Sequence, residues 1–167
     1  MPTTPNFALP YPAATDPADV PADIQRLADK LDSMPLSSSE LAYAQITTSV
    51  SVAAAATAVV TAPSVVYPAA PVLVEFCTGF ALPGAGGQLF ITLFRDGVAV
   101  GDVAAMLIAA GAAGSGVPVY VATRVTQTAA AHIYAISART NSGTGTISAG
   151  AGGAGVYQPA WMRVSRA

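Results

Sequence analysis

Charged side chains are scarce in this sequence of 167 residues. Asp, Glu, Lys and Arg make up 10% of the chain, against about a quarter in an ordinary soluble domain. A chain with so little charge either hides surface in an assembly or covers itself with small residues such as Ala, Gly, Ser and Thr. The net charge is −2 and the arginines after residue 40 are scattered rather than aligned. This composition argues against a nucleic-acid partner.

Residues with reactive side chains are scarce too. The single cysteine, Cys77, excludes an intrachain disulfide framework, and we expect it to pack as a small apolar residue in the core. The single histidine, His132, lies in a strand pattern without the partners of a catalytic triad, so we expect it to be a structural or a surface residue. Asp96 and Asp102 lack the spacing of a calcium loop. We therefore expect no enzyme activity, no cofactor and no metal.

Long apolar runs are missing as well. The two stretches richest in Ala and Val, 49–62 and 98–113, are interrupted by polar residues, glycine or proline. A membrane-spanning helix needs about 20 apolar residues in succession, so we expect no membrane partner. The N-terminus lacks the basic region and apolar run that are typical of a signal peptide.

The N-terminal region differs from the rest in charge and pattern. Residues 1–40 hold six acids and two bases, whereas the remainder holds three acids and five bases. Residues 1–15, called the arm below, contain four prolines and no charge, which favours an extended conformation. Phe7, Leu9 and Tyr11 alternate along the arm and are typical of anchors that dock in a partner's groove. A disordered terminus is the alternative.

Residues 16–34 form the one helix that the sequence predicts, and a serine-rich linker completes this segment at residue 39. Ile24, Leu27 and Leu31 recur at spacings of three and four, as in the seam of a coiled coil. Fewer than two heptads cannot hold a coiled coil by themselves. The seam therefore either joins copies that are already held together or packs on its own β domain.

From residue 40 onward the sequence predicts short strands with no helical crossovers, and residues 40–167 are expected to form one β domain. Alternating apolar residues and bounding turn residues carry this prediction. The expected strands are 41–52, 57–61, 64–67, two within 71–97, then 98–100, 103–110, 117–128, 131–140, 144–149 and 156–167. Segment 103–110 is helical by propensity, but we predict a strand because it lies between glycine-rich turns. This pattern indicates an antiparallel sandwich or barrel.

The stretch 71–97 is the centre of the predicted domain. It reads as two long strands joined in a hairpin by the glycine-rich turn 84–87, and Asp96-Gly97 then makes a tight turn because glycine accepts a positive φ. Phe90 and Phe94 make the second strand apolar on both faces, whereas a solvated face is normally polar. We therefore expect another layer or another subunit to cover it. Near the C-terminus, Trp161 and Val164 are predicted as apolar anchors.

Parts of the chain resemble a known family. Residues 10–12 and 16–24 resemble the opening of virion surface proteins of actinobacterial tailed phages, which are described as minor tail, tail-fibre or head-fibre proteins. Residues 72–76, 94–101 and 132–136 are similar to the jelly-roll heads of the tumour-necrosis-factor and C1q type. The resemblance implies a mainly β jelly-roll head, a homotrimer, and an N-terminal segment that attaches the head to the virion surface.

Decoration of the capsid exterior is the function that the sequence favours, because the shaft repeats of a reaching fibre are missing. The partner would be the major capsid protein or a tail protein. Docking on the virion is assigned to Phe7, Leu9 and Tyr11, and trimer contact to Ile24, Leu27, Leu31, Phe90 and Phe94.

The alternative is a tail-fibre or minor tail protein that acts as an adhesin for a host-surface glycan or protein. Its site would lie on the loops 111–117 or 141–155. Those loops are rich in Gly, Ala and Ser and poor in the aromatic residues that sugar sites use, which weighs against this alternative.

Overall fold

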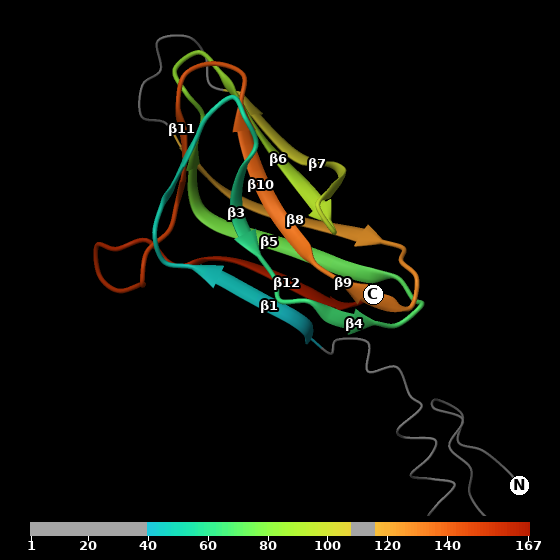
Figure 1. Cartoon of the computed structure of the whole chain (residues 1–167). Coiled ribbons are helices and arrows are strands. Elements are labelled where there is room, and N and C mark those ends of the chain that lie inside the picture. Colours follow the sequence, from blue (N-terminus) through green and yellow to red (C-terminus); the bar gives the residue numbers. More distant parts are fainter. Residues whose placement is uncertain (1–39, 108–115) are drawn as a thin grey trace, which may run out of the picture. The chain divides into compact units, whose positions relative to one another are not determined.

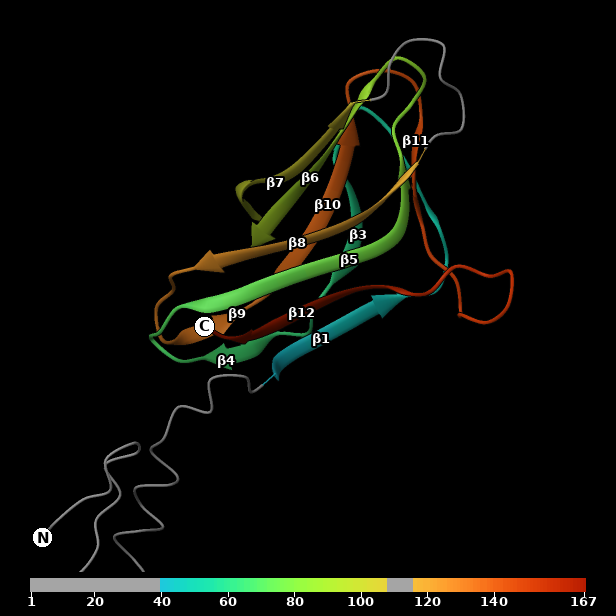
Figure 2. The same cartoon turned by 180° about the vertical axis from the view of Figure 1, so that it is seen from behind.

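The computed structural model describes residues 40–107 and 116–167, and these residues form an all-β domain (Figures 1 and 2). The predicted arm and helix, with Phe7, Leu9, Tyr11, Ile24, Leu27 and Leu31, lie outside the described residues. The strands are β1 (Glu40–Ile46), β2 (Val50–Val52), β3 (Thr57–Thr61), β4 (Val65–Tyr67), β5 (Val72–Leu82), β6 (Gln88–Arg95), β7 (Val98–Leu107), β8 (Val117–Val125), β9 (Ala130–His132), β10 (Tyr134–Thr140), β11 (Gly145–Ser148) and β12 (Ala160–Arg166).

The strands form two main antiparallel sheets and one small pair. The first sheet runs β1-β12-β5-β11-β2, with β8 paired to β5 as well. The second sheet runs β3-β10-β6-β7, and β4 pairs with β9. Figure 1 shows the two main sheets as two layers whose strands cross. The predicted mainly β, antiparallel class is confirmed for the described residues. The connectivity of a tumour-necrosis-factor jelly roll, the helix and the arm stay predictions.

The core lies between the two sheets and is built by the predicted alternation. Val72, Val74 and Phe76 of β5 are buried, as are the inward residues of the second sheet, among them Leu89 and Ile91. Because successive side chains of a strand point to opposite faces, strands such as β5 and β12 give alternate residues to this core. Burial of such side chains contributes about 1.5–3 kcal/mol each, and this is what holds the sheets together.

The glycine-rich turn 84–87 does not close a hairpin, contrary to the prediction. β5 pairs with β12, β11 and β8, whereas β6 pairs with β10 and β7, so the turn carries the chain from one sheet to the other. The alternation of apolar residues indicates a strand and its buried face, but it does not indicate which strand pairs with it. A Cβ on Gly84 would lie 2.2 Å from the Ser142 carbonyl oxygen, so glycine is needed where this turn packs on a neighbouring one.

The Asp96-Gly97 turn is confirmed. Arg95 pairs with Val98, and the two residues between them have φ values of 53° and 78°. Both φ values are positive, as in the tight turn that suits the twist of a hairpin. This turn joins β6 to β7 in the second sheet.

Two of the predicted strands are each interrupted in the structure, and two other predicted segments form a single strand. Residues 41–52 break into β1 and β2, which pair with different strands, β12 and β11. Residues 131–140 break at Ile133, whose N–H donates to Asp96 Oδ1 at 2.8 Å, and the chain changes partner from β4 to the second sheet. Segments 98–100 and 103–110 belong to one strand, β7, as far as residue 107.

His132 has a structural role, one of the two that the sequence predicted. It is buried, and its Nδ1 lies 2.7 Å from Asp96 Oδ2 while its Nε2 lies 3.3 Å from the Thr128 carbonyl oxygen. The hydrogen bonds from the Ile133 N–H and from His132 lower the pKa of Asp96. One aspartate thus joins the β6–β7 turn to the break between β9 and β10.

Two residues predicted for the core lie on an outer face instead. Trp161 pairs with Cys77, and both are only partly buried, whereas the neighbouring pair Met162 and Phe76 points inward and is fully buried. The prediction for Val164 is confirmed, because that residue is fully buried. The phase of the alternation decides the outcome, since a shift of one residue exchanges the two faces of a strand.

Candidate binding site on the outer face of the first sheet

Four neighbouring strands place two rows of side chains on the outer face of the first sheet. The first row, read across β1, β12, β5 and β8, consists of Gln45, Trp161, Cys77 and Tyr120. The second row consists of Tyr43, Arg163, Glu75 and Ala122. Residues two apart on a strand share a face, so strand register alone brings these distant parts of the sequence together.

The two rows contain a pair of aromatic rings at the β1–β12 edge. The rings of Tyr43 and Trp161 have their centroids 6.4 Å apart and an interplanar angle of 24°. The Tyr43 hydroxyl donates to Gln45 Oε1 at 2.9 Å, and Tyr43 is 41% exposed. The result is an aromatic surface that solvent reaches, with an amide group beside it.

A cavity of about 460 Å³ lies beside this aromatic surface. Its lining consists of Tyr43, Gln45, Cys77, Gly79, Gln158, Pro159 and Trp161. None of these side chains is charged, and the two glutamines offer both donors and acceptors of hydrogen bonds. A Cβ at Gly79 would meet nothing within 4 Å, so the missing side chain leaves room there. We call this cavity the groove.

The loop 150–155 helps to build the groove. The Gly150 N–H donates to the Gln158 carbonyl oxygen at 3.2 Å, and the Gly152 N–H donates to the Tyr157 carbonyl oxygen at 2.9 Å. These bonds fold the loop back on itself. Gln158 and Pro159 are thereby placed at the wall of the groove, directly before β12.

Glu75 organises the second row from a buried position. It is 5% exposed, and it accepts hydrogen bonds from the Tyr120 hydroxyl at 2.5 Å and from Arg163 Nε at 2.8 Å. Burial alone raises the pKa of a carboxyl group, but the hydrogen bonds from Tyr120 and Arg163 and the charge of Arg163 outweigh it. The pKa of Glu75 is therefore lowered.

The ion pair with Glu75 also positions Arg163 beside the aromatic pair. The guanidinium nitrogen Nη2 of Arg163 lies 2.7 Å from Glu75 Oε2, and the carbon Cζ lies 5.9 Å from the centroid of the Trp161 ring. The charges of the pair offset each other next to the groove. The guanidinium group of Arg163 is therefore fixed near the indole ring of Trp161, and the ion pair adds little net charge beside the groove.

The residues that sequence reasoning assigned to function lie elsewhere. Phe90 and Phe94 are half-buried on the second sheet, where the Arg139 Cζ sits 4.1 Å above the Phe90 ring, so part of the expected cover comes from the chain itself. The docking residues of the arm and the loop residues 111–115 lie outside the described part of the chain. Of the proposed adhesin loops, 141–155 leads into the groove wall but does not supply its aromatic rings.

The sequence analysis missed the groove because it considered mainly the alternate residues of each strand that were expected to be buried. In β1 that phase is Ala42, Ala44 and Ile46, so Tyr43 and Gln45 were left as ordinary surface residues. Aromatic and amide residues in the exposed phase of β1, together with the single tryptophan in β12, are the signal that marks this face.

No metal cluster or membrane-spanning helix is present in the part of the chain that the structure describes. Within 40–107 and 116–167, no three His, Cys, Asp or Glu side chains gather closely enough to hold a metal ion. The same ranges contain no helix with the length and hydrophobicity needed to cross a membrane.

No protein-family model matches the chain, and no curated protein matches it in sequence. One similar solved structure is a carbohydrate-binding module (CBM6cm-2) from Cellvibrio mixtus lichenase 5A in complex with cellotriose, with 15% identity, a TM-score of 0.33, and coverage of 81% of this chain and 91% of that one. Another is the C-terminal CBM6 of LamC, a marine laminarinase from Zobellia galactanivorans, with 15% identity, a TM-score of 0.29, and coverage of 66% and 75%. Similarity at this level does not establish a common ligand.

Proposed function

We propose that the β domain is a non-catalytic carbohydrate-binding module that holds a sugar in the groove. The observation that carries the proposal is the aromatic pair, Tyr43 and Trp161, beside the amides of Gln45 and Gln158. A sugar ring has an apolar C–H face, which packs on an aromatic ring, and hydroxyl groups, which exchange hydrogen bonds with amides. Ligand sites in proteins typically combine such apolar walls with a few polar groups in a volume of roughly 300–1,000 Å³.

The ligand that fits this groove is a neutral sugar. No charged side chain lines the groove, and the charge of the nearby Arg163 is offset by Glu75. An acidic sugar would need a cation that is free to pair with it, since a desolvated carboxylate without a partner is costly. The proposal therefore favours neutral oligosaccharides over uronic or sialic acids.

The setting of this module is the virion surface. The family resemblance of the N-terminal residues supports a tail-fibre or minor tail protein whose head binds a host-surface glycan. A trimer with three grooves would bind a multivalent cell surface far more tightly than one groove binds a single glycan. In this proposal, Ile24, Leu27 and Leu31 carry the trimer contact together with Phe90 and Phe94.

Decoration of the capsid exterior is the second candidate, favoured by the exposed apolar strand β7. Val98 and Leu107 of this strand are 70% and 69% exposed, and such an edge suits contact with a protein more than contact with a sugar. In this case the partner would be the major capsid protein. Immunogold labelling of intact particles separates the two candidates, because decoration places the label on the head and adhesion places it on the tail.

The test is binding of the full-length chain to an array of neutral and acidic glycans, followed by titration calorimetry with the best ligand. We expect Trp161→Ala to weaken binding at least tenfold, because loss of a buried aromatic anchor costs more than about 1.4 kcal/mol. Trp161→Phe should retain part of the affinity. Val66→Ala, at an exposed position on β4, is the control and should bind as the wild type does.

Thermal melting of each variant shows whether the fold is kept. If the folded Trp161→Ala protein binds like the wild type, the groove is not the site. If the wild type binds no glycan on the array, the proposed function is wrong.

A further inference from the structure

A second pair of aromatic rings lies at one end of the groove. The rings of Phe80 and Tyr157 have their centroids 5.6 Å apart and an interplanar angle of 27°, and Tyr157 is 47% exposed. Phe80 follows Gly79 in β5, and Tyr157 directly precedes Gln158. Gly79 and Gln158 both line the groove, so the second pair begins one residue beyond this lining in each segment.

A β-bulge places Phe80 on the outer face of the first sheet. The bulge lies between Thr78 and Ala81, where β5 has one more residue than the paired stretch of β8. Thr78 and Ala81 are both fully buried. Because neighbours on a strand point to opposite faces, Gly79 and Phe80 between them both lie on the outer face. The bulge thus continues the face that carries the groove.

The Tyr157 ring is held from two sides. A Cβ on Gly116 would lie 2.3 Å from Cζ of Phe80, so the Phe80 ring packs on the backbone just before β8 and supports Tyr157. The Gly152 N–H donates to the Tyr157 carbonyl oxygen at 2.9 Å, and a Cβ on Gly150 would lie 2.5 Å from that oxygen. This second aromatic surface is therefore fixed before a ligand binds, which lowers the entropic cost of binding.

No side chain separates the two aromatic surfaces at position 79. A Cβ on Gly79 would meet nothing within 4 Å, and the residue is exposed. Gln158 is exposed as well and offers an amide between the two surfaces. The groove is thus open toward the second pair of rings.

We propose that the ligand is a linear neutral oligosaccharide, with some of its sugar units on Tyr43 and Trp161 and others on Phe80 and Tyr157. The inference rests on the proposed function and names the ligand class of the same site. One sugar unit can use a single aromatic surface, whereas a chain of units offers an apolar face to each. The second surface adds no charge, which again suits a neutral ligand.

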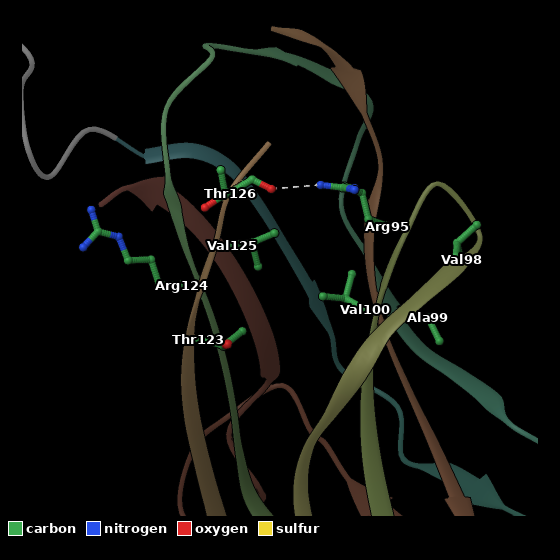
Figure 3. Close-up of a pocket in the computed structure, with 8 residues that line it drawn as sticks. All are labelled: Arg95, Val98, Ala99, Val100, Thr123, Arg124, Val125 and Thr126. Atoms are coloured by element: carbon green, nitrogen blue, oxygen red, sulfur yellow. Dashed lines mark hydrogen bonds between the residues drawn. The ribbon is translucent and has the colours of Figure 1, made fainter. Parts of the chain in front are cut away.

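Another cavity of the domain lacks this arrangement (Figure 3). It has a volume of about 330 Å³ and lies between β7 and β8. Val100 and Val125 point into it, and Arg95 donates to the Thr126 carbonyl oxygen at 3.1 Å. Its lining contains no aromatic ring. We therefore do not expect the sugar chain to bind there, and Val100 serves as a control position.

Titration calorimetry of the full-length chain with a length series tests the proposal. The series runs from the disaccharide to the hexasaccharide of the neutral linear glycan that binds best. In the wild type, the hexasaccharide should bind at least about tenfold more tightly than the disaccharide. In Tyr157→Ala this ratio of affinities should fall to about one, because the second surface is lost. Tyr157→Phe keeps the ring and should keep the ratio.

Gly79→Leu provides a second variant that does not remove a ring. Its Cβ meets no atom within 4 Å, so the fold should be kept, while the new side chain stands between the two surfaces. The ratio of affinities should again fall to about one. Val100→Ala, in the other cavity, is the control and should keep the ratio of the wild type. Trp161→Ala should weaken the binding of both sugars.

The outcomes separate this inference from the proposed function. If the wild type binds the disaccharide and the hexasaccharide equally well, the site does not extend to the second pair of rings. The same conclusion follows if Tyr157→Ala and Gly79→Leu, shown to be folded by thermal melting, both keep the wild-type ratio. In these cases a short sugar still binds in the groove and the proposed function stands. A wild type that binds no glycan would overturn both.

Discussion

At the scale of single residues, Glu75 is the side chain on which the outer face of the first sheet depends most. Its carboxylate is buried and bound by Tyr120 and Arg163, and Arg163 in turn lies beside Trp161. A buried carboxylate in such a network stabilises the fold only while it is ionised and paired. The residue therefore links stability, pH and the shape of the groove.

Glu75→Gln should lower the free energy of unfolding at pH 7 by about 1–3 kcal/mol, since a charged hydrogen-bonded group is lost. The pKa of Glu75 is lowered in the folded state, so its contribution is present above the unfolded value near 4.5 and is lost as the pH falls through the folded value. Urea titrations from pH 7 to pH 3 should show the two proteins converging in stability at acidic pH.

Glu40→Gln is the control for this prediction, because Glu40 is exposed at the start of β1. It should leave the unfolding free energy nearly unchanged. A Glu75→Gln protein that differs from the wild type by the same amount at every pH would contradict the assigned role of the ionised carboxylate.

Cys77 gives a direct report of groove occupancy, because it is the only cysteine of the chain and lines the groove. Burial raises the pKa of its thiol, so its reaction with a maleimide is expected to be slow at neutral pH. A bound neutral oligosaccharide should slow the reaction further, by at least about tenfold at saturation, as measured by mass spectrometry over time. Labelling at the same rate with saturating sugar would place the ligand elsewhere.

Residues of the core could be predicted from sequence better than residues of the groove. Burial follows from apolar alternation, which is local, and Val164 is buried as predicted. The groove depends on register across β1, β12 and β5, which no local pattern encodes. Cys77 was assigned to the core for this reason, although its neighbour Phe76 is the residue that points inward.

At the scale of elements, the Asp96-Gly97 signal predicted the β6–β7 turn correctly, and this turn yields a testable prediction. Gly97 has a φ of +78°, and a Cβ there would meet nothing within 4 Å. Gly97→Ala should therefore cost about 1–2 kcal/mol through backbone conformation alone. Gly101→Ala, in β7, also meets nothing within 4 Å but needs no positive φ.

Urea denaturation of the two glycine variants measures this difference. Gly101→Ala should be neutral or slightly stabilising, since alanine restricts the unfolded chain. Equal losses in both variants would show that the positive φ at residue 97 is not what the turn requires.

Strand partners and strand breaks could not be predicted at the scale of elements. The β5–β6 connection has the sequence of a hairpin, yet β5 is already bonded on both sides by other strands. The break at Ile133 depends on a carboxylate 37 residues away, Asp96. Such contacts are set by the whole fold, so they are not visible in the local pattern.

At the scale of the whole molecule, we propose that the full-length chain is a trimer. Multi-angle light scattering of the purified protein should give three times the mass of the chain, 16.6 kDa. A combined Ile24→Glu and Leu27→Glu variant should shift the mass toward one chain, because charge in an apolar seam is costly. A wild-type monomer at micromolar concentration would contradict the trimer and the role of that seam.

In the proposed adhesin, which is tethered through its N-terminus, the position of the groove on β1 has a mechanical consequence. Tyr43 and Gln45 follow Glu40, the first residue of β1, by only a few positions. A pull between the tether and a captured sugar would run mainly along this short piece of covalent backbone, with β12 sharing it through Trp161. Under this proposal, the remaining strands would bear little of the load.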